Sequence, residues 1–292
     1  MIFIIKKLTL EIKLIFIFLL FLLILYNLKE KTKYKQNDIT LVTALFHIKS
    51  KHKFGEYLNW VKNLLQINTS IVFFIDKKIS KQIKILRPKT YEHKTIWIET
   101  NIEALYSYKN FFKYFLKSYG IDYEKKIHSV FLYIVWAEKC YFLKRVINFN
   151  FFNSKCFYWI DAGFFRNYKK SKRYFNNWPS KKKCFEDPRV IINSIRNLSF
   201  TEIDGLKNFN NSIYNKIRRK NNVGGGFFGG KSNYLLKFIS IYYKTIKLFI
   251  KKDMFIGKDQ NLFAYIAYLN KHIVNIVYSG NFFYFISYLS NK

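Results

Sequence analysis

The sequence predicts an α/β fold, in which a mostly parallel sheet is flanked by helices. Three short runs have the length and the aliphatic and aromatic content of strands: residues 39–47, 70–76 and 95–99. Residues 55–68 have helical spacing and separate the first two runs. Because strands that alternate with helices build βαβ units, we expect these strands to be parallel. Half of the residues are hydrophobic, which is ample material for one large core.

The N-terminus contains an apolar segment that precedes this domain. Residues 14–26 are thirteen consecutive apolar residues, preceded by lysines and followed by Asn-Leu-Lys-Glu-Lys rather than the small residues of a cleavage site. This pattern favours an uncleaved signal anchor over a removed signal peptide or a core helix. We therefore predict an anchor at 1–28, a polar stem at 29–37 and one domain at 38–292, in a single-pass, type II membrane layout.

The formal net charge is +33, which in isolation suggests nucleic acid or an anionic membrane as partner. The excess is spread along the chain and accompanies heavy use of Asn, Ile, Phe and Tyr, residues that an AT-rich genome encodes often. No specific nucleic-acid partner is therefore expected. A basic surface would favour anionic substrates such as nucleotide diphosphates, or an anionic leaflet.

The three cysteines are Cys140, Cys156 and Cys184, with no CxxC pair among them. An odd count excludes a full disulfide framework, and the lack of partnered histidines argues against a zinc site. One pair could still oxidise in a secretory compartment, which would leave one thiol free. Cys156 is expected to be buried in a strand.

The next strand carries the first candidate site residue. Residues 156–160 form an aromatic-rich run that is too short for a typical helix, and Asp161 follows it directly. Ligands of open α/β sheets bind beyond the carboxyl ends of the strands, where a carboxylate can hold Mn²⁺ or Mg²⁺ on a substrate phosphate. The alternative is that Asp161 opens a turn or caps a helix.

Helical patterns are predicted on both sides of this strand. Residues 102–119 and 127–149 have aromatic stripes at helical spacing, and within the second Lys139 shares a face with Trp136. Lys139 could reach a phosphate near the strand, although the spacing alone favours a solvated lysine. Residues 164–183 read as a basic loop, and 187–197 as a short helix with a proline in its first turn.

A glycine-rich block follows, with five glycines within 224–230. Such glycines indicate positive φ angles or backbone packed against a ligand. The spacing from Gly225 to Ser232 also satisfies a P-loop, although no apolar strand precedes it. Beyond the block, helices are expected at 234–250 and 257–270, with Asp259 as a fair N-cap of the second, and a strand at 273–278.

Four motifs in this order resemble the HtrL/YibB-type proteins, a family similar to glycosyltransferases of the GT-A fold. They are Leu41-Val-Thr-Ala44, Trp159-Ile-Asp161-Ala-Gly163, the glycine block and the late Gly-x-Asp259-Gln260. The resemblance covers about residues 39–280. It implies a GT-A-like (Rossmann-like) domain that moves a sugar from a nucleotide-sugar donor to a glycan, lipid or protein acceptor. The family's Asp-x-Gly-Arg turn is replaced here by His47-Ile-Lys49.

The resemblance also implies roles for individual residues. Asp161 matches the first carboxylate of the Asp-x-Asp signature, which binds metal and the donor's diphosphate, and Gly163 stands in place of the second. Asp259 and Gln260 match a late pair that contacts the acceptor or donor sugar, where a carboxylate could act as general base. Thr43 would lie at the base or ribose of the nucleotide.

The glycine block would shape the pocket for donor sugar and acceptor. Its candidate residues are Gly225, Gly226, Gly229 and Gly230. The departing diphosphate would be neutralised by a metal or by basic residues, for which Arg166, Lys139 and Lys231 are available. Three rival functions stay open at this point: a P-loop nucleotide-binding protein, a membrane-anchored basic binding protein, and an inactive transferase fold.

Overall fold

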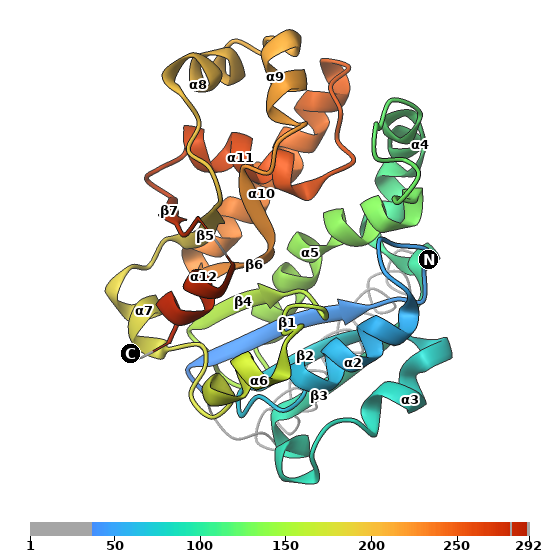
Figure 1. The fold of residues 1–292 in the computed structure, drawn as a ribbon, viewed down its shortest axis with the longest axis vertical. Coiled ribbons are helices and arrows are strands. Elements are labelled where there is room, and N and C mark those ends of the chain that lie inside the picture. Colours follow the sequence, from blue (N-terminus) through green and yellow to red (C-terminus); the bar gives the residue numbers. More distant parts are fainter. Residues whose placement is uncertain (1–36, 281, 291–292) are drawn as a thin grey trace, which may run out of the picture.

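The computed structural model describes residues 37–280 and 282–290, whose strands form one seven-stranded sheet (Figure 1). The strands are β1 Ile39–Leu45, β2 Ser70–Asp76, β3 Thr95–Thr100, β4 Cys156–Ile160, β5 Val190–Ser194, β6 Val223–Lys231 and β7 Val274–Tyr278. Their order is β3-β2-β1-β4-β6-β5-β7, and β6 alone runs antiparallel to its neighbours. The predicted α/β fold with a mostly parallel sheet is confirmed.

Helices cover both faces of the sheet. They are α2 Phe54–Leu64, α3 Ser80–Lys84, α4 Tyr106–Gly120, α5 Val130–Phe149, α6 Tyr168–Ser171, α7 Lys181–Glu186, α8 Phe200–Lys207, α9 Asn211–Ile217, α10 Ser232–Lys251, α11 Asp259–Leu269 and α12 Phe282–Tyr288. One apolar cluster packs α4, α5, α10 and α11 on the sheet, and a second packs α2, α3, α7 and α12 on the opposite face. Alternate residues of β1 enter the two clusters, as the period of a strand requires.

Most predicted elements are found within a few residues of their expected bounds, but residues 187–197 are not a helix. They contain the strand β5, whose five residues are all buried between β6 and β7. The run Val190-Ile191-Ile192 is β-branched and fits a central strand, so pairing on both sides overrides the helical signal of Pro188. Pro188 precedes the strand, where its carbonyl accepts from the N–H of Lys231.

The glycine block, for which no regular element was predicted, is a strand. It forms β6, which pairs with β4 on one side and β5 on the other. A Cβ on Gly229 would lie 2.1 Å from the carbonyl oxygen of Phe157, and one on Gly230 would lie 2.5 Å from that of Arg189. These glycines therefore allow neighbouring backbone to approach closely. A P-loop needs its glycines in a turn between a strand and a helix, so the P-loop interpretation of this block was wrong.

A disulfide joins the central strand to a surface helix. Cys156 of β4 is bonded to Cys184 of α7, while Cys140 of α5 is buried and free. The expectation that one pair oxidises and one thiol stays free agrees with this arrangement.

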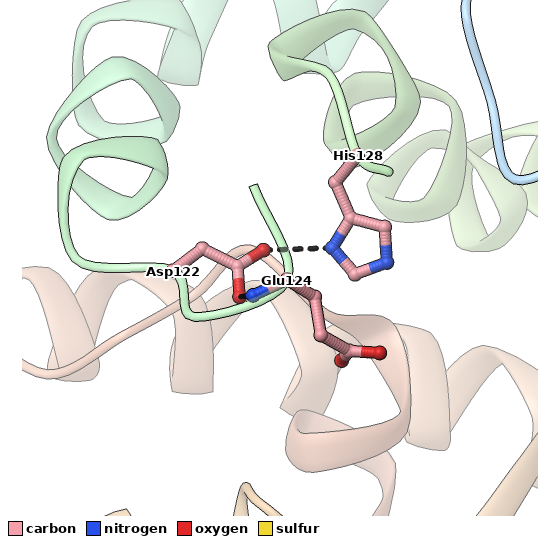
Figure 2. A group of neighbouring side chains, drawn as sticks. All are labelled: Asp122, Glu124 and His128. Atoms are coloured by element: carbon pink, nitrogen blue, oxygen red, sulfur yellow. Dashed lines mark hydrogen bonds and ion pairs between the residues drawn. The ribbon is translucent and has the colours of Figure 1, made fainter. Parts of the chain in front are cut away.

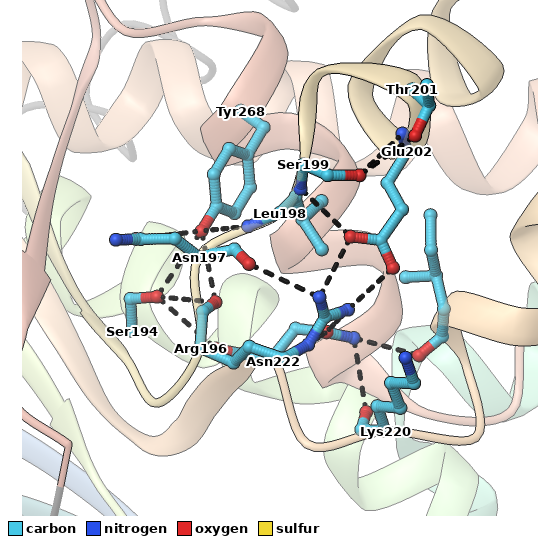
Figure 3. Close-up of polar contacts among 11 residues, drawn as sticks. Ser194, Arg196, Asn197, Leu198, Ser199, Thr201, Glu202, Lys220, Asn222 and Tyr268 are labelled. Carbon is cyan, nitrogen blue, oxygen red and sulfur yellow. Dashed lines mark hydrogen bonds and ion pairs between the residues drawn. The ribbon is translucent and has the colours of Figure 1, made fainter.

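The helices α8 and α9 lie at one end of the molecule, far from β3 in Figure 1. A polar network, drawn in Figure 3, fastens their segment to the sheet. Arg196, just after β5, donates to both carboxylate oxygens of Glu202 at 2.8 and 2.9 Å and to Asn222 Oδ1 at 2.6 Å. Glu202 also completes a capping box with Ser199 at the start of α8.

The predicted anchor at 1–28 and nearly all of the stem lie outside the described residues. Within 37–280 and 282–290, no helix is long and apolar enough to cross a membrane.

Candidate functional site

Asp161 lies at the carboxyl end of β4, as predicted. Its backbone N–H donates to Gly226 O at 2.8 Å, which ties this end of β4 to β6. Its Oδ1 accepts from the indole Nε1 of Trp159 at 2.7 Å, and its side chain is 40% exposed. Asp161 does open a turn, since its carbonyl accepts from the N–H of Phe164 at 2.9 Å, but its carboxylate caps no helix in the described part of the chain. It is held at the edge of the sheet with part of its surface free for a ligand.

Lys139 reaches the same edge from α5 and is the centre of the site. Its Nζ lies 3.0 Å from Asp161 Oδ1 and 2.7 Å from Asp259 Oδ2, and it donates to Gly225 O at 2.9 Å. The side chain is only 2% exposed. The contact to Gly225 O is a hydrogen bond, the two carboxylate contacts are ion pairs, and Asp259 Oδ2 has no hydrogen-bond partner. The interpretation of Lys139 as a solvated lysine was wrong, because its side chain is buried, and it also lines the smaller of the two cavities described below.

Burial and ion pairing act in opposite directions on these groups. Burial alone would lower the pKa of Lys139, but attraction to Asp161 and Asp259 outweighs it and raises the pKa. Burial raises the pKa of Asp259, and the ion pair with Lys139 only partly opposes this. When all three are ionised, the group carries one net negative charge, and Asp161 is the member that faces ligands.

Asp259 occupies a different position from the one its motif suggested. It is the first residue of α11, whose N-cap is Lys258, and its side chain is 4% exposed. A Cβ on Gly225 would lie 2.8 Å from Asp259 Oδ2, so β6 screens the carboxylate. Asp259 lines neither of the cavities described next. Its neighbour Gln260 does, and donates from Nε2 to Val223 O at 3.0 Å.

Two cavities meet at Asp161. The larger, of about 570 Å³, has a floor of β6 glycines and walls that are partly aromatic. Its lining includes Gly224, Gly225, Gly226, Gln260, Phe164, Phe227 and Phe285. The smaller, of about 120 Å³, lies beyond the end of β1 and is lined by aromatic side chains that include Tyr57 and Trp136. Asp161, Gly163 and Arg166 line both cavities, so they form the boundary between them.

Trp60 of α2 covers Gly163 at this boundary. A Cβ on Gly163 would lie 2.8 Å from Cε3 of Trp60. The guanidinium carbon of Arg166 lies 4.5 Å from the centre of the same ring, and its Nε donates to Gly163 O at 3.4 Å. Trp60 therefore fills the space that a second carboxylate would need, and it supports an exposed arginine instead.

The remaining predicted residues lie away from the cavities. Thr43 is fully buried in β1, and Gly229 and Gly230 pack against neighbouring strands. Trp60 was not predicted as a site residue, because a tryptophan within an amphipathic helix is expected to pack in the core. The link from Lys139 to Asp259 was not predicted either, since it depends on how α5 and α11 pack across β6.

A second polar group, Asp122, Glu124 and His128, lies in the connection between α4 and α5 (Figure 2). One ligand atom from each lies within 4.8 Å of the others, so this largely buried group could hold a metal ion. No sequence motif had marked it.

A protein family described as "Bacterial protein of unknown function (HtrL_YibB)" matches residues 37–290, nearly all of the described part of the chain. No curated protein matches the chain.

Proposed function

The chain belongs to the HtrL/YibB family, and we propose that it is a glycosyltransferase, which moves a sugar from a nucleotide-sugar donor to a glycan, lipid or protein acceptor. One observation carries the proposal. A half-exposed carboxylate, Asp161, lies at the carboxyl edge of an α/β sheet where two cavities meet, backed by a buried cation and flanked by an exposed one. Two adjoining cavities suit a reaction that brings two substrates together.

Arg166 is the residue best placed for the donor's diphosphate. It is exposed, lines both cavities, and its guanidinium is held on Trp60. A planar guanidinium can bind two phosphate oxygens at once and stays charged at any relevant pH. As the sugar–oxygen bond breaks, negative charge grows on the diphosphate, and Arg166 would stabilise it there.

We assign the proton transfer to Asp161. An acceptor hydroxyl in the larger cavity would attack the anomeric carbon, pass its proton to the Asp161 carboxylate, and displace the nucleoside diphosphate. This is an inverting reaction. Asp259, predicted as the general base, is too buried for that role in this arrangement. We assign it to hold Lys139, whose ammonium lies 3.0 Å from Asp161 Oδ1 and keeps that carboxylate in place.

The metal ion expected at Asp161 does not fit the residues around it. Among the residues that the structure describes, Asp161 is the single carboxylate that lines the cavities, Trp60 fills the space beside Gly163, and the ammonium of Lys139 lies 3.0 Å from Asp161 Oδ1. A divalent ion there would have one carboxylate as its protein ligand, so the proposed transfer uses protein residues alone.

We also propose that residues 1–28 anchor the chain in a membrane as a type II protein. The Cys156–Cys184 disulfide supports an oxidising compartment for the domain. Protease would be added to sealed vesicles whose cytoplasmic face points outward. If it digested the domain, this topology would be wrong.

Turnover tests the proposed activity. Full-length protein in detergent would be incubated with UDP-, GDP-, dTDP- and CMP-sugars, with and without Mn²⁺, and release of the nucleotide measured. We expect release from one donor class, loss with Asp161→Asn, and no loss with the exposed control Asp204→Asn. A basic binding protein would be favoured if binding did not distinguish between nucleotides, weakened steeply with salt and were unchanged in Asp161→Asn. Specific binding without turnover would favour an inactive transferase fold.

A further inference from the structure

We propose that Asp122, Glu124 and His128 form a binding site for a divalent transition-metal ion, distinct from the site around Asp161. All three residues come from the short connection between α4 and α5, and Figure 2 shows their side chains gathered there. One ligand atom from each lies within 4.8 Å of the others. The proposal does not depend on the glycosyltransferase activity.

The strongest support is a buried imidazole nitrogen without a partner. His128 is 0% exposed, its Nδ1 lies 2.7 Å from Asp122 Oδ2, and its Nε2 has no hydrogen-bond partner. In the tautomer whose Nδ1 donates to Asp122 Oδ2, Nε2 presents a bare lone pair. Leaving such an acceptor unsatisfied in the interior costs free energy. A metal ion on Nε2 would remove that cost.

The surroundings of His128 match what a metal-binding imidazole needs. A carboxylate that receives the other ring proton fixes the ring and makes the free nitrogen a better ligand. Asp122 is itself held by Tyr133 Oη and by the backbone N–H of Glu124 at 2.9 Å. Asp122 thereby fixes the orientation of the fully buried ring.

Glu124 supplies the second ligand and already attracts cations. Its carboxylate pairs with Lys258 and lies 3.7 Å from the ammonium of Lys51, and the side chain remains 30% exposed. A divalent ion would take over the neutralisation of Glu124, and the partly exposed carboxylate offers it a route from solvent.

The ligand types indicate which metal. An imidazole combined with carboxylates suits Zn²⁺ or Mn²⁺, whereas Mg²⁺ and Ca²⁺ prefer oxygen ligands alone. With His128 and Glu124 as ligands and Asp122 as the carboxylate that orients the ring, the remaining positions on the ion would be open to water. The competing interpretation is a purely structural network that ties this connection to α5 through Asp122, His128 and Tyr133.

Metal content and affinity decide between these interpretations. Full-length protein would be stripped with EDTA and dialysed against Zn²⁺, with metal content measured by mass spectrometry and affinity by competition with a chromophoric chelator. We expect about one Zn²⁺ per chain, weaker binding of Mg²⁺, and at least a tenfold loss of affinity in Glu124→Gln and in His128→Gln. In the Co²⁺-loaded protein, a visible absorption band would report coordination and disappear in both variants.

Two controls make the result specific. Glu103→Gln removes an exposed carboxylate near the start of α4 and should leave Zn²⁺ binding unchanged. Asp161→Asn should also leave it unchanged, which separates this site from the proposed catalytic one. Because His128 is fully buried, Glu124→Gln serves as the variant that keeps the fold, checked by circular dichroism. The proposal is overturned if the wild-type chain binds no stoichiometric metal, or if Zn²⁺ binding survives Glu124→Gln or is lost in Asp161→Asn.

Discussion

The side chains of Lys139 and Asp259 form an ion pair of 2.7 Å that is almost completely shielded from water, with exposed fractions of 2% and 4%. Removing either partner of a buried ion pair costs free energy, because the other charge then stays buried without a counter-ion. The pair also fixes the relative position of α5 and α11 behind β6. It is thus both part of the candidate site and a structural element.

Replacing Lys139 should therefore destabilise the protein strongly. Lys139→Met leaves the buried Asp259 carboxylate without its counter-ion, and we expect the free energy of unfolding to fall by about 3–5 kcal/mol. Urea unfolding followed by circular dichroism measures this. Lys144→Met, on an exposed position of the same helix, is the matched control and should change stability by less than about 0.5 kcal/mol. Equal stabilities of the two variants would contradict the pairing.

Two adjacent glycines of β6 should respond differently to a methyl group. A Cβ on Gly225 would lie 2.8 Å from Asp259 Oδ2, whereas on Gly224 the nearest atom, Asn193 Nδ2, is 3.4 Å away. We expect Gly225→Ala to cost about 1–3 kcal/mol, because the carboxylate must move from its place beside Lys139. Gly224→Ala should cost clearly less. If thermal unfolding of the two variants were indistinguishable, Asp259 would not lie directly behind β6.

The Cys156–Cys184 disulfide should make stability depend on reductant. It closes a loop with a sequence separation of 28 residues, and its loss should cost about 2–4 kcal/mol. Thermal unfolding with and without dithiothreitol measures the effect of reductant on stability. This effect should be absent in Cys184→Ser. Cys140→Ala should retain it, because Cys140 is free. If the wild-type melting temperature were the same with and without dithiothreitol, the bond would not form.

The Arg196–Glu202 pair predicts one component of the acid sensitivity. Hydrogen bonding from Arg196 lowers the pKa of Glu202 from 4.5 to about 2. Because the pKa is depressed in the folded state, the stabilisation is complete above pH 4.5 and is lost as the pH falls towards 2. Solvent screening reduces it to about 1–2 kcal/mol. Urea unfolding between pH 5 and 3 should show a smaller pH dependence in Glu202→Gln than in the wild type; identical slopes would argue against the pair.

The elements that the sequence predicted well are those whose local pattern agrees with their tertiary environment. The strands β1, β2 and β4 are largely apolar runs of strand length and are buried throughout, and Asp161 at the end of β4 followed from one of them. The helix predicted at residues 187–197 was wrong, because sheet pairing outweighed a helix-start signal. No strand was predicted for the glycine block, because glycine has a low strand propensity. Pairing with β4 and β5 makes it a strand.

The site was predictable residue by residue but not as an arrangement. Asp161, Lys139, Arg166 and Asp259 were each candidates, yet no sequence pattern indicates that a lysine from α5 would bridge two aspartates from different elements. Nor does the sequence show that Trp60 occupies the space beside Gly163. Such relationships arise from packing across the sheet, and they changed the roles that we assign to Lys139 and Asp259.

Calorimetric titration of the full-length protein with nucleoside diphosphates and their sugars tests the central proposal most directly. The site predicts saturable binding of one nucleotide class without added metal, weakened at least tenfold in Arg166→Gln, and sugar transfer or hydrolysis that is lost in Asp161→Asn. Arg173→Gln, also an exposed arginine of the basic segment after β4, should bind like the wild type. Binding that does not distinguish nucleotides, vanishes in high salt and is equal in all four proteins would contradict the glycosyltransferase proposal.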